Sequence, residues 1–194
     1  MIVGRIACVA LLVAAFAAAS SCAAERPSAW AVPLERAGVP NLHKVSDSLY
    51  RSAQPTAEGM TNLVALGVKT VINLRRFHDD KDEIGGLKLT PRHIPINTWD
   101  VDVAQAREFL ETVSNTNAAP VLVHCLHGAD RTGSMIAIYR VVKEGWTADE
   151  AVKELTEGGY NYHSVWKHLP DYVRKTAEKL KTEETAVGKS ADEK

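Results

Sequence analysis

One cysteine and one arginine stand at a spacing that suits phosphate chemistry. Cys125 follows the predicted strand 120–124, and Arg131 follows after five intervening residues, where a helix is predicted to begin. A compact loop between a strand and a helix can turn successive backbone N–H groups inward and form a nest for an anion. The helix N-terminus adds unpaired N–H groups and partial positive charge, and the guanidinium of Arg131 matches phosphate oxygens. The spacing therefore predicts a phosphate-binding loop with a cysteine at its base.

The positive field of such a loop would act on Cys125 itself. It favours the thiolate over the thiol, and a thiolate is a nucleophile near neutral pH. Gly128 and Gly133 permit the tight backbone and the close helix packing that this loop needs. The alternative is a small buried cysteine at a strand end, but that would leave Arg131 and the glycines unexplained. The residues therefore favour a cysteine nucleophile.

The segment around Cys125 resembles a known signature. Residues 124–133 read HCLHGADRTG, which is similar to the pattern H-C-x-x-G-x-x-R-T-G of cysteine-dependent phosphatases of the tyrosine and dual-specificity superfamily. Residues 50–55 (YRSAQP) and 67–75 (GVKTVINLR) look like the opening segments of compact bacterial and atypical dual-specificity phosphatases. The resemblance covers most of residues 42–169. It implies hydrolysis of phosphomonoesters through a phosphocysteine intermediate, with no metal and no cofactor.

The resemblance also implies a role for individual residues of the loop. Cys125 attacks phosphorus, and Arg131 binds the phosphoryl oxygens. Thr132 donates a hydrogen bond to the thiolate as it leaves, although it could also be an ordinary first-turn residue. His124 orients the loop. The residues that bind the substrate would be Leu126, His127, Gly128, Ala129, Asp130 and Arg131.

The reaction needs an acid for the leaving oxygen and a base for the attacking water. By resemblance this group is an aspartate upstream of the cysteine. Asp100, which follows Trp99 and precedes a predicted helix, is the first choice. Asp102 is an alternative, but it suits the N-cap of that helix. Asp130 is another, because its place in the loop resembles that of the proposed acid in myotubularin and Sac-type phosphoinositide phosphatases; it could instead stabilise the helix dipole.

Basic and aromatic residues are candidates for the mouth of the loop. They are Arg51, Arg75, Arg76, Trp99 and Trp166. The arginines would either attract polyanionic substrates or pair on the surface with the aspartates and glutamates of residues 79–83. The tryptophans would either line the rim or pack into the core.

The composition limits the partners of this loop. The chain has 23 basic and 24 acidic residues, a net charge of −1 and 6% aromatic residues. Nucleic-acid-binding proteins normally show a basic excess or a stacking surface, so no nucleic acid is expected as a partner. His124, Cys125 and His127 have no fourth ligand at a suitable spacing, so no metal site is expected. We expect a monomer.

The leading function is therefore hydrolysis of a phosphomonoester, either on tyrosine, serine or threonine of a phosphorylated protein or on a small molecule. Inositol phosphates and phosphoinositides are alternative substrates, although the loop lacks lysine and contains Asp130. Sulfur transfer and arsenate reduction also use a cysteine at an anion loop, but the predicted domain contains no second cysteine to resolve an intermediate. A catalytically weak phosphate-binding module is the alternative from another class.

The first 24 residues are typical of a secretory signal peptide. Arg5 precedes the uncharged apolar run 6–19, and small residues follow it. The run is shorter than the ~20 residues of a membrane-spanning helix, so an anchor helix that stays uncut is the less favoured interpretation.

Two cleavage sites compete at the end of this segment. Cleavage after Ala23 or Ala24 would release a soluble exported protein, whereas cleavage before Cys22 would leave a lipid anchor on that cysteine. Residues 25–41 would form an exported N-terminal segment in either case. We therefore expect an exported protein that is periplasmic or anchored to the membrane by lipidation.

The elements that must position the loop alternate between strands and helices. Strands are predicted at 42–45, 49–50, 68–74, 93–96 and 120–124, and helices at 56–66, 102–114, 130–143, 147–157 and 164–179. The residues between 75 and 89 are predicted as a polar loop. This order predicts an α/β fold: a central, mostly parallel sheet flanked by helices, with the phosphate-binding loop between a strand and a helix. The phosphatase domain is expected at 42–181 and a disordered tail at 182–194.

Overall fold

A computed structural model of the chain describes residues 26–192, and side-chain surroundings up to residue 186. The predicted signal peptide and the candidate lipid anchor at Cys22 lie outside these residues. Within residues 26–192, no helix combines the length and the apolar character that crossing a membrane requires.

The centre of the fold is a mixed six-stranded sheet in the order β1-β2-β3-β6-β4-β5. The strands are β1 (Val32–Pro33), β2 (His43–Lys44), β3 (Leu49–Ser52), β4 (Thr70–Asn73), β5 (Thr90–His93) and β6 (Val121–His124). The strands β3, β6, β4 and β5, which are neighbours in that order, run parallel, and β1 and β2 add an antiparallel edge. The predicted α/β class with a mostly parallel sheet is thus confirmed.

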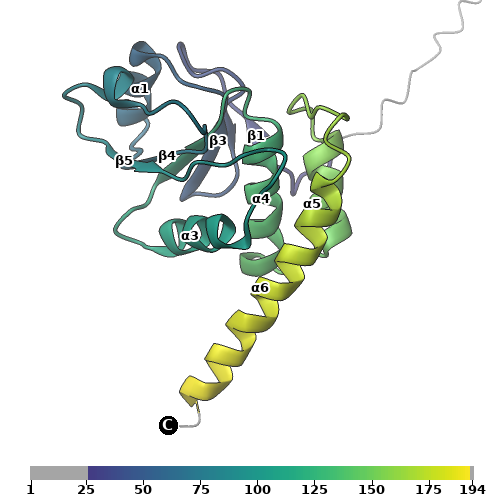
Figure 1. Cartoon of the computed structure of the whole chain (residues 1–194). Helices are drawn as coiled ribbons and strands as arrows, with labels where there is room; N and C mark the ends of the chain where they lie inside the picture. Colours follow the sequence, from purple (N-terminus) through teal and green to yellow (C-terminus); the bar gives the residue numbers. More distant parts are fainter. Residues whose placement is uncertain (1–25, 193–194) are drawn as a thin grey trace, which may run out of the picture.

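Helices cover both faces of this sheet (Figure 1). They are α1 (Ala57–Ala65), α2 (Lys81–Ile84), α3 (Val103–Ser114), α4 (Asp130–Lys143), α5 (Ala148–Glu157) and α6 (Leu169–Asp192). The larger core lies between the sheet and α3 to α6, and the smaller core lies between the sheet and α1 and α2. The phosphate-binding loop leaves the central strand β6 and enters α4, which α5 and α6 cover.

Side-chain alternation along the central strands sorts the site residues between the two faces. Val121, Val123 and Cys125 belong to the larger core, whereas Leu122 belongs to the smaller one. His124 therefore lies on the α2 side of the sheet, opposite to Cys125. The two residues that begin the signature consequently have different neighbours.

Three helices begin where the sequence predicts, because their N-cap side chains satisfy first-turn N–H groups. Thr56 Oγ1 accepts from the N–H of Gly59 at 3.2 Å. Asp102 and Thr147 each form a complete capping box. α1 also ends as expected, at Gly67, whose φ of 90° suits glycine.

Two predictions along the chain differ from the structure. The edge strand is Thr90–His93 rather than 93–96. The buried pair Ile94 and Ile96 continues past the regular ladder, although their N–H groups still donate to the carbonyls of Asn73 and Leu74 at the end of β4. The exposed side chains of β5 hid the strand from a search for apolar alternation. The predicted polar loop 75–89 contains the short helix α2, which buries Ile84.

The ends of the predicted domain also differ from the structure. Residues 26–41 pack onto the fold, since β1 pairs with β2 and the N–H of Ala31 donates to Glu154 at 2.8 Å. The last helix begins at Leu169, later than predicted, with Pro170 in its first turn. It then continues to Asp192, within the predicted disordered tail, where Glu183 pairs with Arg107 of α3 at 2.7 Å.

Candidate active site

The loop between β6 and α4 turns its carbonyl groups away from its centre. The carbonyl of Leu126 accepts from the N–H of Gln54 at 3.2 Å. The carbonyl of His127 accepts from Asn41 Nδ2 at 3.0 Å, and that of Gly128 from Arg51 Nη2 at 2.7 Å. Each of these three consecutive carbonyls is therefore held by a donor from outside the loop.

The N–H groups of the same loop have no such partners. Among the described residues, no backbone N–H from Leu126 to Arg131 donates a hydrogen bond to the protein. Buried backbone donors are normally paired, and unpaired donors that converge at a helix N-terminus form an anion site. This loop therefore has the arrangement predicted for binding phosphate.

Gly128 is the residue that allows the loop to lie directly on β3. Its φ of 69° is in the left-handed region that favours glycine. A Cβ at this position would come within 2.5 Å of the backbone of Ser52. The signature glycine thus allows the loop to contact the YRSAQP segment. In the sequence, the loop and this segment are two separate similarities.

Cys125 and Arg131 lie at the base and at the edge of this loop. Cys125 is buried and free of any disulfide. Arg131 is half-buried, and its Nη1 donates to the carbonyl of Leu74 at 3.4 Å. Arg131 also lines a pocket of about 320 Å³ beside the loop.

Thr132 lies directly behind the loop. Its side chain is fully buried, and its Oγ1 has no hydrogen-bond partner among the described residues. A buried hydroxyl without a partner is uncommon. Thr132 is therefore able to serve a group that appears during the reaction, such as the leaving thiolate.

The three candidate acids lie in different surroundings. Asp100 is exposed, and its side chain makes no hydrogen bond to the described residues. Asp102 accepts from the N–H of Ala104 at 2.9 Å within its capping box, so its structural interpretation holds. Asp130 is bound by His163, through the backbone N–H at 2.9 Å and through Nδ1 at 2.7 Å.

The rim of the pocket is both basic and aromatic. Its lining residues are Arg75, Arg76, Phe77, Ile96, Asn97, Thr98, Trp99, Leu126 and Arg131. Trp99 is 73% exposed and meets Trp166 edge to face, with ring centroids 4.4 Å apart. Arg75 and Arg76 form no ion pair with the aspartates or glutamates of the described residues, which matches the rim interpretation. Arg51 is not at the mouth but beneath the loop.

Comparison with known proteins agrees with this geometry. Residues 30–168 match the family model described as "DSP-PTPase phosphatase fused to NAD+ Kinase". The chain belongs to the DSP-PTPase phosphatase family. It is 34% identical over 157 residues to the dual specificity protein phosphatase TpbA of Pseudomonas aeruginosa, which is 80% of this chain and 71% of TpbA. The crystal structure of TpbA superposes with a TM-score of 0.73 at 32% identity, over 81% of this chain and 98% of that one.

Other relatives have lower sequence identity to this chain and cover less of it. The inositol diphosphatase DSP2 of Oryza sativa is 24% identical over 115 residues, which are 54% of this chain and 55% of DSP2. The catalytic core of Siw14 shares the fold, with a TM-score of 0.60 at 18% identity, over 76% of this chain and 95% of that core. The family model and the match to TpbA, rather than these two, show that the chain is a cysteine-dependent phosphatase.

Sequence reasoning missed the residues that support the phosphatase loop. His124 Nε2 lies 2.8 Å from Asp80 Oδ2, and both side chains are buried. Burial alone would raise the pKa of Asp80, but the hydrogen bonds from His124 and Gln54 lower it below its ordinary value. Asn73 also donates to Asp80 at 3.0 Å. Asp80 was expected among surface acids, and nothing in the spacing of 44 residues indicates its pairing with His124.

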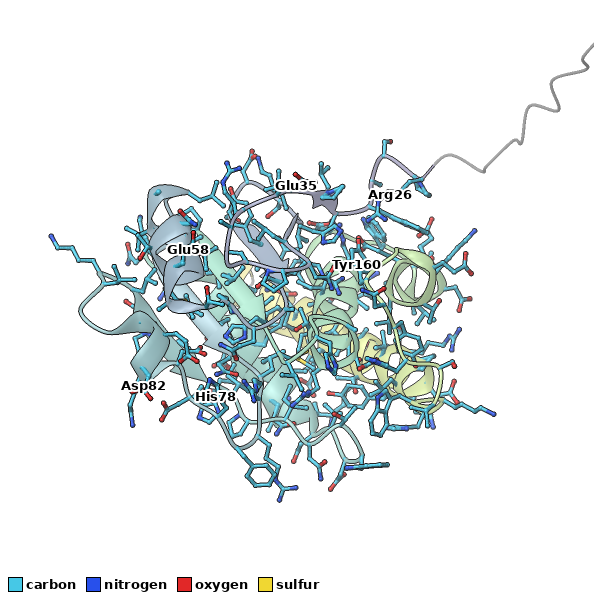
Figure 2. All side chains as sticks on the ribbon, turned by 90° about the horizontal axis from the view of Figure 1, so that it is seen from above. Arg26, Glu35, Glu58, His78, Asp82 and Tyr160 are labelled. Carbon is cyan, nitrogen blue, oxygen red and sulfur yellow. The ribbon has the colours of Figure 1, made fainter. Side chains whose placement is uncertain are left out.

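His78, Asp80 and Glu83 form the one group in residues 26–192 whose ligand atoms all lie within 4.8 Å of one another. His78 lies on a different side of the molecule from Tyr160 (Figure 2). His78 already bonds to Glu83 at 3.0 Å, and Asp80 bonds to His124. These hydrogen bonds explain why the three side chains lie close together: the group supports His124.

Proposed function

We propose that this phosphatase hydrolyses phosphomonoesters through a phosphocysteine at Cys125. The observation that carries the proposal is the loop of consecutive unpaired N–H groups around a buried cysteine. Six N–H groups and the guanidinium of Arg131 would surround the phosphoryl oxygens, where negative charge gathers in the transition state. Thiolate attack on phosphorus breaks the P–O bond, and water then breaks the P–S bond.

Asp100 is the proposed acid and base. It protonates the departing oxygen and later takes a proton from the attacking water. Its neighbour Trp99 lines the pocket. Asp100 itself is not a lining residue, and its exposed side chain supports the proposal because it is free to turn toward a substrate. The carboxylate of Asp130 is already held by two hydrogen bonds to His163, which makes it the weaker candidate.

Phosphotyrosine on a protein is the proposed substrate. The exposed rings of Phe77 and Trp99 line the pocket and offer apolar faces to a phenyl ring. TpbA, which this chain resembles, has been solved in complex with pTyr. An inositol phosphate is the second candidate, because Arg75, Arg76 and Arg131 line the same pocket and would attract a polyanion.

Hydrolysis of p-nitrophenyl phosphate by the wild type and by Cys125→Ser tests the mechanism. The serine variant should lose at least about a thousandfold in turnover, since the nucleophile is removed. Ser48→Ala, at an exposed turn, is the control and should retain activity. Equal turnover by wild type and Cys125→Ser would contradict the cysteine mechanism. A panel of phosphotyrosine peptides and inositol phosphates then separates the two substrate classes by kcat/KM.

Export is proposed as the setting of this activity, on the pattern of the first 24 residues. Cell fractionation should place the protein in the periplasm or at the membrane. Loss of membrane association in Cys22→Ala, with export retained, would support the lipid anchor. Recovery of an unprocessed chain in the cytoplasm would contradict export.

A further inference from the structure

A buried arginine without a carboxylate partner lies beneath the phosphate-binding loop. Arg51 is 1% exposed, and none of the ion pairs among the described residues includes it. Its Nη2 donates to the carbonyl of Gly128 at 2.7 Å, and its Nε has no hydrogen-bond partner. The guanidinium lies 3.6 Å from the centre of the Tyr160 ring. A buried cation is costly unless opposite charge compensates it.

The buried carboxylate whose charge acts on Arg51 is already hydrogen-bonded to other groups. Glu154 binds Arg140 through two hydrogen bonds, of 2.8 and 3.1 Å. It also accepts from Tyr160 at 2.8 Å and from the N–H of Ala31. Arg140 also pairs with Glu144, so two carboxylates share this arginine. Glu154 acts on Arg51 through its charge, but Arg51 makes no direct ion pair with it.

The nucleophile is a second anionic candidate beside Glu154. Burial lowers the pKa of Arg51, while Tyr160, Glu154 and Cys125 act in the opposite direction. The geometry places the two residues together: Arg51 of β3 pairs in register with Val123 of β6, and Val123 and Cys125 face the same core. Arg51 therefore lies on the same face of the sheet as Cys125, and its guanidinium reaches Gly128 in the loop that begins at Cys125. An arginine stays protonated even when buried, so its charge acts on Cys125 at every working pH.

We propose that Arg51 is a positioning residue, whose cation stabilises the Cys125 thiolate from beneath and whose hydrogen bond holds the Gly128 carbonyl away from the bound phosphate. This role rests on the proposed phosphocysteine function. The two actions are linked, because turning the Gly128 carbonyl inward would place its negative end toward the anion. The YRSAQP segment then contributes directly to the site through its arginine.

Other charged groups surround the same loop. Arg140 and Glu154 pair with each other on the α4 and α5 side. Asp130 pairs with His163 at the start of α4, and Asp80 holds His124 on the opposite face. Arg131 approaches from the pocket side. Glu144 shares Arg140 with Glu154. Arg51 is the cation that lies beneath the loop and makes no ion pair with a carboxylate of the described residues.

The pH dependence of Cys125 alkylation by iodoacetamide tests this role, because only the thiolate reacts. The rate is followed on the mature chain by the mass of the peptide that contains Cys125. Arg51→Gln removes the charge but keeps a donor for Gly128, and Arg51→Lys keeps the charge. Arg92→Gln, at an exposed arginine of β5, is the matched control.

On the acid side of the profile, where the rate still rises with pH, Arg51→Gln should react about tenfold more slowly, equivalent to a one-unit upward displacement of the profile. It should match the wild type on the alkaline plateau. Arg51→Lys and Arg92→Gln should stay within about twofold of the wild type. Inhibition of the wild type by inorganic phosphate should weaken in Arg51→Gln. A rise in KM without any change in the alkylation profile would contradict the thiolate role.

Thermal unfolding shows whether each variant is folded. A folded Arg51→Gln with the wild-type alkylation profile would overturn the proposal. Where Arg51→Gln fails to fold, Arg51→Lys decides: a wild-type profile supports the charge role, and a tenfold loss overturns it. Alkylation needs no turnover, so a wild type without phosphatase activity would contradict the proposed function and leave this test intact.

Discussion

At the residue scale, the site depends on residues that lie around the loop rather than in it, two through their side chains and Gln54 through its backbone N–H. Asn41, Gln54 and Arg51 each bind one loop carbonyl. His124, held by Asp80, approaches the carbonyl of Cys125 at 3.3 Å. These contacts fix the backbone orientation on which phosphate binding depends.

The two candidate acids can be separated by the leaving group of the substrate. Asp100→Asn should lower kcat strongly on phenyl phosphate, whose leaving oxygen needs a proton, and much less on p-nitrophenyl phosphate. Asp130→Asn should show no such difference, because Asp130 is bound to His163. The assignment of Asp100 would be wrong if Asp130→Asn alone showed the leaving-group dependence.

The sequence alone indicates which residues react, but not which residues hold them in place. Cys125, Arg131 and Thr132 fall within ten consecutive residues, so their spacing carries the prediction. Asp80 and His163 reach the loop from 44 and 33 residues away along the chain. Contacts at that separation depend on the folded topology, which no local pattern contains.

At the scale of elements, the phosphate-binding loop rests on the end of β3. Gly128 lies against the backbone of Ser52, and Arg51 of the same strand binds its carbonyl. The parallel pairing of β3 with β6 places these two segments side by side. A change at this contact should therefore affect the loop and the catalytic rate together.

Gly128→Ala should damage both stability and catalysis. The left-handed φ costs alanine about 1 kcal/mol, and the contact with Ser52 forces the loop to move. We expect kcat/KM to fall by about a hundredfold, as displaced catalytic groups often cause. Gly67→Ala is the control, since it has a φ of 90° but nothing within 4 Å of the new Cβ. Equal activity in the two variants would contradict the contact.

The elements themselves were predictable where local chemistry fixes them. The capping boxes at Asp102 and Thr147 set two helix starts correctly. The edge strand β5 was misplaced, because one side of it has no neighbouring strand and its side chains are exposed. The order β3-β6-β4 also needs tertiary information, since neighbours in the sheet are far apart along the chain.

At the scale of the whole molecule, one buried glutamate joins the N-terminal segment to the helical layer. Glu154 of α5 binds Arg140 of α4 and the backbone of Ala31. Figure 2 shows Arg26 close to Tyr160, and Arg26 Nη2 donates to Tyr160 Oη at 2.8 Å. The domain therefore includes residues that the sequence placed before its boundary.

Acid should destabilise the fold through Glu154. Burial alone would raise its pKa, but the hydrogen bonds and charge of Arg140 lower it below the ordinary value of 4.5. The folded carboxyl then binds a proton less tightly than the unfolded one, so its contribution to stability is present above pH 4.5 and is lost as pH falls through the lower folded pKa.

Glu154→Gln should therefore lose about 3 kcal/mol of unfolding free energy at pH 7, as expected for a broken buried pair. Its stability should also depend less on pH in the acid range than that of the wild type. Urea unfolding between pH 3 and 7 measures both effects, with the exposed Glu157→Gln as control. An unchanged acid profile in Glu154→Gln would show that other carboxyls dominate.

The central claim is that Cys125 carries the phosphoryl group during turnover. The direct measurement is rapid quenching of the wild type with excess p-nitrophenyl phosphate, followed by digestion and mass spectrometry. The account predicts one added phosphoryl group on the peptide that contains Cys125, and none in Cys125→Ser. A phosphoryl group on another residue, or hydrolysis with no phosphorylated peptide at any quench time, would contradict it.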